Sequence, residues 1–212
     1  MYPINLSIKG RRCAVVGGGR IAQRKVKTLL CEGAAVVVIA PRITEEISTL
    51  HDEGKIIWKK AVYTKGSLQG FFIIICATDD AAVNAVAAAE AKALGALVNV
   101  VEPSDLSNFM VPAQVRRGNL LLTVSTGGRS PAFSRQLKHE LELSFGDTYG
   151  IWLEILAGLR LEMKERLENS CKREEFWRYA LDAHLLELVK QGKFEKAEAE
   201  IRNAISSFGT ES

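Results

Sequence analysis

The sequence predicts an α/β protein: a parallel sheet with helices, then a small α+β segment, then a domain made of helices. In the first 112 residues, short apolar runs alternate with segments of helical pattern, as in strand–helix–strand units. The first run breaks into glycines before a helix, and from residue 146 onward apolar residues recur at helical spacing alone. The predicted domains are residues 1–112, 113–145 and 146–212.

The first turn is rich in glycine. Residues 13–16 form the apolar run, and the spacing G-x-G-x-x-A follows from Gly17 to Ala22. In a dinucleotide-binding unit, Gly17 allows the tight turn, and Gly19 lets the backbone approach a pyrophosphate held by the helix start. A turn that only connects strand and helix is the alternative. The residues expected to contact the cofactor here are Gly17, Gly18, Gly19, Arg20 and Ile21.

The next apolar run, residues 35–40, completes a βαβ unit of roughly 30 residues. Domains that choose NAD usually carry an acidic residue at the end of this strand. Here Pro41 and Arg42 follow instead, and an arginine favours the 2′-phosphate of NADP. We therefore expect both residues at the cofactor, with the choice between NAD and NADP open at this position.

The rest of the sheet follows the same alternation. Short strands or connectors are expected at residues 56–58 and 61–63, after a helix capped by Thr44. The continuous apolar run at residues 71–77 is typical of a strand covered on both faces. An alanine-rich helix and a last strand at residues 97–101 complete the predicted sheet.

Polar residues follow the last two apolar runs. Thr78 and Asp79 come after the first run, and Thr78 is also expected to cap the helix that follows. Glu102 and Asp105 come after the second run. Ligands of open α/β sheets bind beyond the carboxyl ends of the strands. We therefore expect these turns beside the glycine turn, with Ala77, Thr78 and Asp79 at the cofactor.

The middle segment has its own pattern. A charged turn is expected at residues 114–119, followed by a strand at residues 120–125. This strand ends in Thr126-Gly127-Gly128-Arg129, and Ser130 with Pro131 is a strong helix start. The helix then carries an apolar stripe at four-residue spacing, which is suited to packing.

Composition narrows the class of partner. Residues 114–145 carry five Lys or Arg and two acidic residues, a basic excess that favours an anionic small molecule over a nucleic acid. The sequence has no long apolar run and no signal-peptide pattern, so we expect a cytoplasmic protein that does not bind membranes. Four dispersed cysteines and three scattered histidines predict buried reduced thiols and no metal site.

Four motifs, in order along the chain, resemble the precorrin-2 dehydrogenase family of sirohaem biosynthesis. They are residues 15–22, 77–80, 99–101 and 125–131. The resemblance implies an NAD-binding Rossmann domain, a dimerisation segment with exchanged strands and a C-terminal helical domain. It also implies NAD-dependent oxidation of precorrin-2 to sirohydrochlorin by a homodimer, and some members of the family go on to insert ferrous iron. NAD is therefore the expected cofactor.

The resemblance also implies roles for single residues. The family places an aspartate directly after the Asn-Val-Val strand, where this chain has Glu102. Glu102 is therefore the expected acceptor of the proton lost with the hydride, and Asp105 is the reserve candidate. Two solvated acids in a surface turn are the alternative. The residues expected to bind the acidic tetrapyrrole are Thr126, Gly127, Gly128, Arg129 and Arg116.

A competing function fits part of the sequence. A non-enzymatic NAD sensor with a Rossmann domain would explain the glycine turn. It would explain neither the paired glycines at 127 and 128 nor the basic middle segment. Titration with an octacarboxylate tetrapyrrole would separate the two functions, because a sensor should ignore that ligand.

Overall fold

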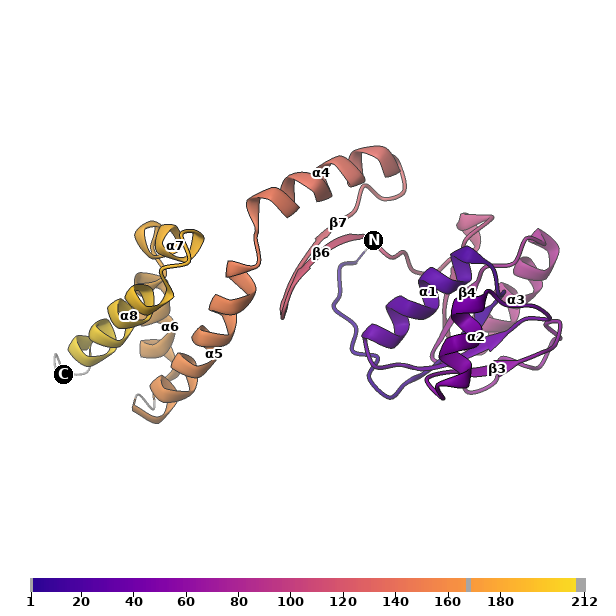
Figure 1. Cartoon of the computed structure of the whole chain (residues 1–212), viewed down its shortest axis with the longest axis horizontal. Helices are drawn as coiled ribbons and strands as arrows, with labels where there is room; N and C mark the ends of the chain where they lie inside the picture. Colours follow the sequence, from indigo (N-terminus) through magenta and orange to yellow (C-terminus); the bar gives the residue numbers. More distant parts are fainter. Residues whose placement is uncertain (1, 167–168, 209–212) are drawn as a thin grey trace. The chain divides into compact units, whose positions relative to one another are not determined.

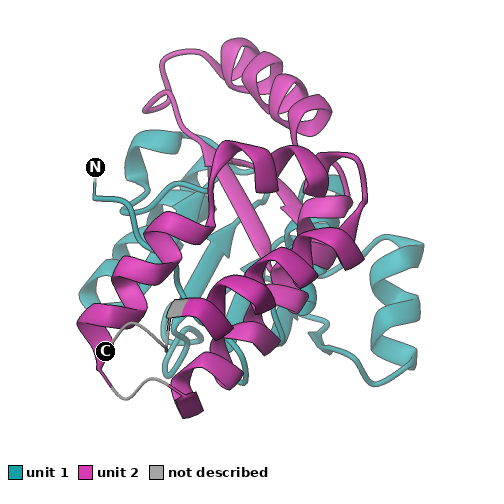
Figure 2. Ribbon diagram, turned by 90° about the vertical axis from the view of Figure 1, so that its left-hand side faces the viewer, with its two compact units in different colours: residues 1–111 teal, residues 112–212 magenta. Residues whose placement is uncertain are grey.

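The structure, a computed structural model, describes residues 2–166 and 169–208. The chain divides into two compact units, residues 1–111 and residues 112–212, which are coloured separately in Figure 2. We call them the sheet unit and the helical unit.

The sheet unit is built on five parallel strands in the order β3-β2-β1-β4-β5. They are β1 (Arg12–Val16), β2 (Ala35–Ile39), β3 (Ile57–Lys59), β4 (Ile73–Cys76) and β5 (Leu97–Val100). Successive side chains of a strand point to opposite faces. Cys13 and Val15 accordingly join one buried cluster, and Ala14 and Val16 join another. The predicted parallel sheet with two covered faces is confirmed.

Helices cover both faces of this sheet. α1 (Arg20–Cys31) and α2 (Glu45–Asp52) pack on one cluster, and Val26 of α1 is fully buried there. α3 (Ala81–Ala93) packs on the other cluster through small side chains such as Ala88. Figure 1 labels these three helices and the strands β3 and β4 of the sheet. The loops that follow the strands lie together at the carboxyl edge of the sheet, which is where open α/β sheets bind their ligands.

The connector between β3 and β4 includes residues 61–63, which form no strand. The hydroxyl of Tyr63 donates a hydrogen bond to the buried carboxylate of Glu90 at 2.5 Å. The same carboxylate accepts from the N–H groups of Gly66 at 2.8 Å and Leu68 at 2.9 Å. Glu90 therefore holds the connector against α3.

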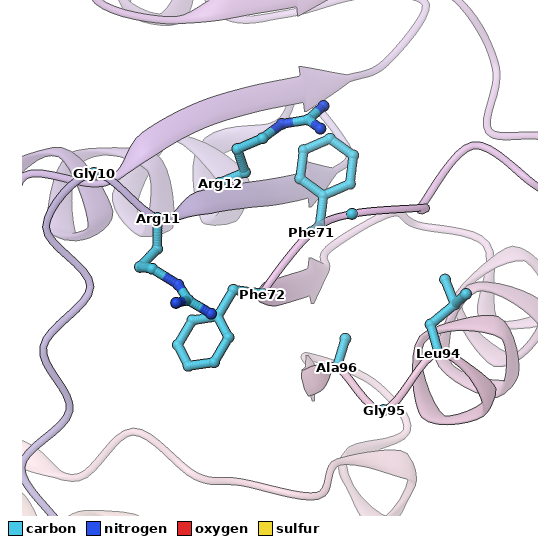
Figure 3. Close-up of a pocket in the computed structure, with 9 residues that line it drawn as sticks. Gly10, Arg11, Arg12, Phe71, Phe72, Leu94, Gly95 and Ala96 are labelled. Carbon is cyan, nitrogen blue, oxygen red and sulfur yellow. The ribbon is translucent and has the colours of Figure 1, made fainter.

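A hollow of about 420 Å³ opens at the amino edge of the sheet. Figure 3 shows Arg11 over the ring of Phe72 and Arg12 over the ring of Phe71, with guanidinium carbons 4.0 and 4.6 Å from the ring centroids. Such stacking covers aromatic faces near solvent. Parallel sheets bind their ligands at the carboxyl edge, so this hollow is not the candidate site.

The helical unit begins with an antiparallel hairpin of β6 (Ala113–Arg117) and β7 (Leu120–Val124). The predicted charged turn over residues 114–119 is wrong in extent, because only Gly118 and Asn119 separate the two strands. Gly118 has φ +56°, the conformation that a two-residue hairpin turn requires. The charged side chains of β6 led us to expect a turn, but the chain turns within two residues and β6 forms a strand.

Helices make up the rest of the helical unit. α4 (Pro131–Ser144) starts as predicted, because Oγ of Ser130 accepts a hydrogen bond from the N–H of Phe133 at 3.2 Å. Phe176 lies in a buried cluster formed by the helices that follow. These helices are α5 (Thr148–Arg166), α6 (Ser170–Ala180), α7 (Ala183–Lys190) and α8 (Phe194–Phe208). The predicted run of C-terminal helices is confirmed.

The four cysteines divide into two kinds. Cys13 and Cys76 are buried, whereas Cys31 and Cys171 are exposed. The prediction of buried thiols is therefore right for the first pair and wrong for the second. Burial raises the pKa of the Cys76 thiol to about 12 and also raises the pKa of Cys13.

Candidate active site

The turn between β1 and α1 requires glycine at its first two positions. Gly17 has φ +120°, and a Cβ there would lie 2.7 Å from the carbonyl carbon of Ala77. A Cβ at Gly18 would overlap the carbonyl oxygen of Arg42 and lie 3.0 Å from the Cβ of Ala40. The turn is therefore wedged between the loops that follow β4 and β2.

Gly19 differs because the space beside it is open. Nothing lies within 4 Å of an ideal Cβ at this position. Gly19 is also the N-cap of α1, where no side-chain hydrogen bond caps the helix and the first turn holds no acidic residue. The N–H groups at this helix start are thus available to an anion. The open space fits the pyrophosphate of a dinucleotide, which can approach the backbone there.

The loop after β2 lies against the glycine turn. The N–H of Thr44 donates a hydrogen bond to the carbonyl oxygen of Gly18 at 3.0 Å. Pro41 and Arg42 are exposed, and Arg42 forms no ion pair with any described residue. The positive charge of Arg42 is therefore available to a ligand bound at the end of β2.

The loop after β4 is the third segment at this turn. The prediction that Thr78 caps α3 is wrong: Oδ1 of Asp80 accepts the capping bonds, from the N–H groups of Ala82 at 2.8 Å and Val83 at 3.2 Å. The Thr78 hydroxyl instead donates to Oδ1 of Asn84 at 2.8 Å. The three adjoining segments carry the predicted cofactor residues Gly17, Gly18, Gly19, Arg20, Ile21, Pro41, Arg42, Ala77, Thr78 and Asp79.

Two candidate bases follow β5. The carbonyl oxygen of Glu102 accepts a hydrogen bond from Nδ2 of Asn84 at 3.0 Å. Asp105 lies in the short 3-10 helix η1 (Ser104–Leu106). Both carboxylates are exposed, and neither forms an ion pair with a described residue. Of the two, Glu102 is the one tied to the loop after β4, since Asn84 also binds Thr78.

Asn84 is a residue that sequence reasoning missed. It is 1% exposed and lies on the face of α3 that buries Ala87, Ala88 and Ala91. An amide on an otherwise apolar helical stripe was the available signal, because a buried amide needs hydrogen-bond partners. The sequence did not show which partners the fold would bring to it.

Lys25 on α1 was missed as well. Its Nζ donates a hydrogen bond to Oδ1 of Asn99 at 3.3 Å, and Nδ2 of Asn99 donates to the carbonyl oxygen of Phe109 at 3.2 Å. Burial lowers the pKa of the Lys25 ammonium, and the nearby charge of Arg24 lowers it further. Lys25 thus joins α1 to the Asn-Val-Val strand. No feature of the sequence distinguished it from the exposed lysines.

Most of the predicted substrate residues form one turn before α4. They are Thr126, Gly127, Gly128 and Arg129. The Thr126 hydroxyl accepts a hydrogen bond from the N–H of Ser130 at 3.2 Å and shares another with the hydroxyl of Ser134 at 3.0 Å. Gly128 has φ +81°, and its N–H forms no hydrogen bond with any described residue. The turn therefore offers a backbone donor to an anion.

Arg116 lies apart from this turn. It pairs with Leu121 near the closed end of the hairpin, whereas Thr126 follows the open end. Three strand residues, or about 10 Å, separate Leu121 from the end of β7. The structure therefore does not gather Arg116 with the other predicted substrate residues.

Two features are absent from the part of the chain that the structure describes. No three His, Cys, Asp or Glu side chains are grouped so that they could hold a metal ion. Among the same residues, every helix is too short or too polar to cross a membrane.

Two family models match separate parts of the chain. The model described as "Putative NAD(P)-binding" matches residues 4–113. The model described as "Sirohaem synthase dimerisation region" matches residues 148–205. The glycine turn and the loops that contact it lie within the first match.

Curated relatives and a solved structure are similar to nearly the whole chain. The siroheme synthase of Methylococcus capsulatus is 40% identical over 196 residues, which are 92% of this chain and 41% of that protein. The siroheme synthase of Chromobacterium violaceum is 34% identical over 210 residues, 99% of this chain and 45% of that protein. The chain thus spans less than half the length of these relatives. The structure of SirC, precorrin-2 dehydrogenase, has a TM-score of 0.75 and 30% identity, with 98% of both chains covered.

Proposed function

This chain belongs to the precorrin-2 dehydrogenase family, and from this premise we propose that it oxidises precorrin-2 to sirohydrochlorin with NAD as hydride acceptor. The observation that carries the proposal is the glycine turn at the carboxyl edge of the sheet. It is open beside Gly19 and closed elsewhere by the loops after β2 and β4. The resemblance seen in four sequence motifs is confirmed at the level of the family.

The residues around the turn fit a dinucleotide. When bound, NAD supplies the hydride acceptor. The N–H groups at the start of α1 would hold the pyrophosphate, and the Thr78 turn borders the same edge. Arg42 follows β2, the strand whose end distinguishes the 2′-hydroxyl of NAD from the 2′-phosphate of NADP. We propose NAD as the cofactor. Because Arg42 would favour a 2′-phosphate, binding of NADP should be tested beside that of NAD.

Glu102 is the proposed base. Dehydrogenation removes a hydride and a proton from the substrate, so a group on the protein must accept the proton. The Glu102 carboxylate is exposed at the carboxyl edge of the sheet, and its backbone is held by Asn84. Compared with the aspartate that the family places here, a glutamate reaches one methylene further. Asp105 remains the reserve candidate.

The turn before α4, in the helical unit, is the segment that we propose binds carboxylates of the substrate. Precorrin-2 carries eight carboxylates, and the turn from Thr126 to Arg129 combines a free Gly128 N–H, a hydroxyl and a guanidinium. Backbone donors and arginine are suited to carboxylates. Arg116 adds positive charge elsewhere on the same unit. We also propose that the chain acts as a homodimer, which the family model over residues 148–205 supports.

Anaerobic incubation with precorrin-2 and NAD tests the function. Sirohydrochlorin and NADH should appear together, as followed by absorbance. A parallel reaction with NADP shows whether the protein, with Arg42 after β2, uses NAD or NADP. Later addition of ferrous iron shows whether sirohaem forms, which some members of the family achieve and which stays a prediction here. A protein that binds NAD but leaves the tetrapyrrole unchanged would be the sensor instead.

A further inference from the structure

One buried amide joins the two loops of the candidate active site. Oδ1 of Asn84 accepts hydrogen bonds from the N–H of Thr78 at 3.2 Å and from its hydroxyl at 2.8 Å. Nδ2 donates to the carbonyl oxygens of Thr78 and Glu102, each at 3.0 Å. A side-chain amide has two N–H donors and one oxygen with two lone pairs. All four positions therefore have a partner within hydrogen-bond distance, and the two carbonyl oxygens around Nδ2 fix the orientation of the amide.

These four bonds connect groups with different tasks. Thr78 lies in the loop that contacts the glycine turn, and Glu102 carries the proposed base. Asn84 is 1% exposed, so its amide depends on these protein partners for its hydrogen bonds. The carboxylate of Glu102 has no partner of its own among the described residues. Its placement therefore depends on its backbone, which Asn84 holds.

We propose that Asn84 is a positioning residue that fixes the backbone of Glu102 relative to the Thr78 loop. The backbone bond from the N–H of Val101 to the carbonyl oxygen of Cys76, at 2.9 Å, already joins the ends of β5 and β4. Asn84 adds a side-chain link from Glu102 itself to the Thr78 loop. The inference rests on the proposed function, because it assigns Glu102 the role of base. It adds that the position of the base is set from α3, by a residue that touches neither substrate nor cofactor.

Asn108 provides a matched control. Its Oδ1 accepts a hydrogen bond from the N–H of Val98 at 2.7 Å, and its Nδ2 donates to the carbonyl oxygen of Ala96 at 3.0 Å. Asn108 thus joins a loop to β5 through the same chemistry, but toward the amino end of the strand. A purely structural role for Asn84 would give the two asparagines similar mutational effects.

The test compares Asn84→Ala, Asn84→Asp and Asn108→Ala in the full chain. The measurements are unfolding by urea, NAD affinity by titration, and kcat and KM for precorrin-2. Asn84→Ala should lower kcat about 10- to 100-fold, because small displacements of a reacting group are costly. It should weaken NAD binding about tenfold, since Thr78, which is half-buried, loses three hydrogen bonds that hold its loop. Asn108→Ala should lose stability while kcat and NAD affinity stay within about twofold of the wild type.

The Asp variant separates the two halves of the proposal. Asn84→Asp keeps the oxygen that accepts from the N–H and hydroxyl of Thr78 but, when ionised, can donate to neither carbonyl oxygen. The Thr78 loop therefore keeps two of its three bonds to position 84, whereas Glu102 loses its one bond. The variant should lower kcat by a larger factor than it weakens NAD binding, with KM for precorrin-2 little changed. This split is expected even if Asn84→Ala does not fold.

Three results would overturn the inference. The first is that Asn84→Ala folds and has the kcat and the NAD affinity of the wild type. The second is that Asn84→Ala and Asn108→Ala change kcat equally. If wild-type protein leaves precorrin-2 unchanged, the proposed function is wrong by itself. In that case the role of Asn84 is tested by NAD affinity alone. The third result against the inference is then an NAD affinity of Asn84→Ala equal to that of the wild type.

Discussion

Gly18 packs so closely against Arg42 that a methyl group at position 18 would overlap the Arg42 carbonyl oxygen. The loop after β2 is also held by the hydrogen bond from the N–H of Thr44 to the carbonyl of Gly18. The second glycine of the turn is therefore required by packing between two loops. The third glycine, Gly19, has open space beside it, where the ligand can approach the backbone.

Gly18→Ala should destabilise the sheet unit. The added methyl group forces the loop carrying Arg42 away from the turn, and overpacking of this kind typically costs about 1 to 3 kcal/mol. Urea unfolding of the variant and the wild type measures the change. Equal midpoints would mean that the turn and the loop are not packed as described.

Glu102→Gln should slow dehydrogenation while leaving NAD binding intact. The amide keeps the size of the side chain but cannot accept the proton, and general-base catalysis typically contributes about 10²- to 10⁴-fold. Steady-state kcat and an NAD titration measure the two effects. Asp105→Asn is the matched variant, and a loss of kcat there with normal turnover in Glu102→Gln would transfer the role to Asp105.

Two thiols should react with an alkylating reagent in the folded protein, and four after denaturation. Cys31 and Cys171 are exposed, whereas Cys13 and Cys76 are buried with raised pKa values, and the thiolate is the reactive form. Mass spectrometry of the modified peptides identifies the sites. Rapid native labelling of Cys76 would contradict the close packing of β4.

Lys25→Met should change how stability depends on pH. The folded pKa of Lys25 lies below its value in the unfolded chain, so in the window below about 10.5 the unfolded chain binds more protons at this site. The wild type therefore gains stability from this residue as pH rises through that window. Urea unfolding at several pH values should show that Lys25→Met lacks this gain and that Lys92→Met, at an exposed position, keeps it.

The fold was predictable where pattern and local chemistry agree. The strands β1, β2 and β4 are continuous apolar runs, and the start of α4 follows from Ser130 and Pro131. β6 was not predicted, because the turn at Gly118 lies within a charged stretch that has no apolar alternation. The cap of α3 was assigned to Thr78 because either Thr78 or Asp80 suits it chemically. Asp80 takes the cap, and the Thr78 hydroxyl bonds Asn84 in the same helix instead.

The candidate site was predictable to the same degree. Parallel topology places the ends of β1, β4 and β5 at one edge, so the neighbourhood of Gly17 and Thr78 followed from strand order. The role of Asn84 did not, because its partners are backbone atoms at positions 78 and 102 that only the folded sheet brings together. Arg116 was grouped with the turn at Thr126 on charge alone, and hairpin register separates them.

NAD titration of Gly19→Asp tests the central claim most directly. A Cβ at position 19 has no neighbour within 4 Å, and the backbone there is extended with φ −80°, so the variant should fold like the wild type. Its carboxylate would occupy the space assigned to the pyrophosphate, and like charges in contact should weaken NAD binding at least about 100-fold. Gly158→Asp, at an exposed helical glycine with equal space, should bind NAD normally. Wild-type NAD affinity in Gly19→Asp would contradict the assignment of the glycine turn as the cofactor site.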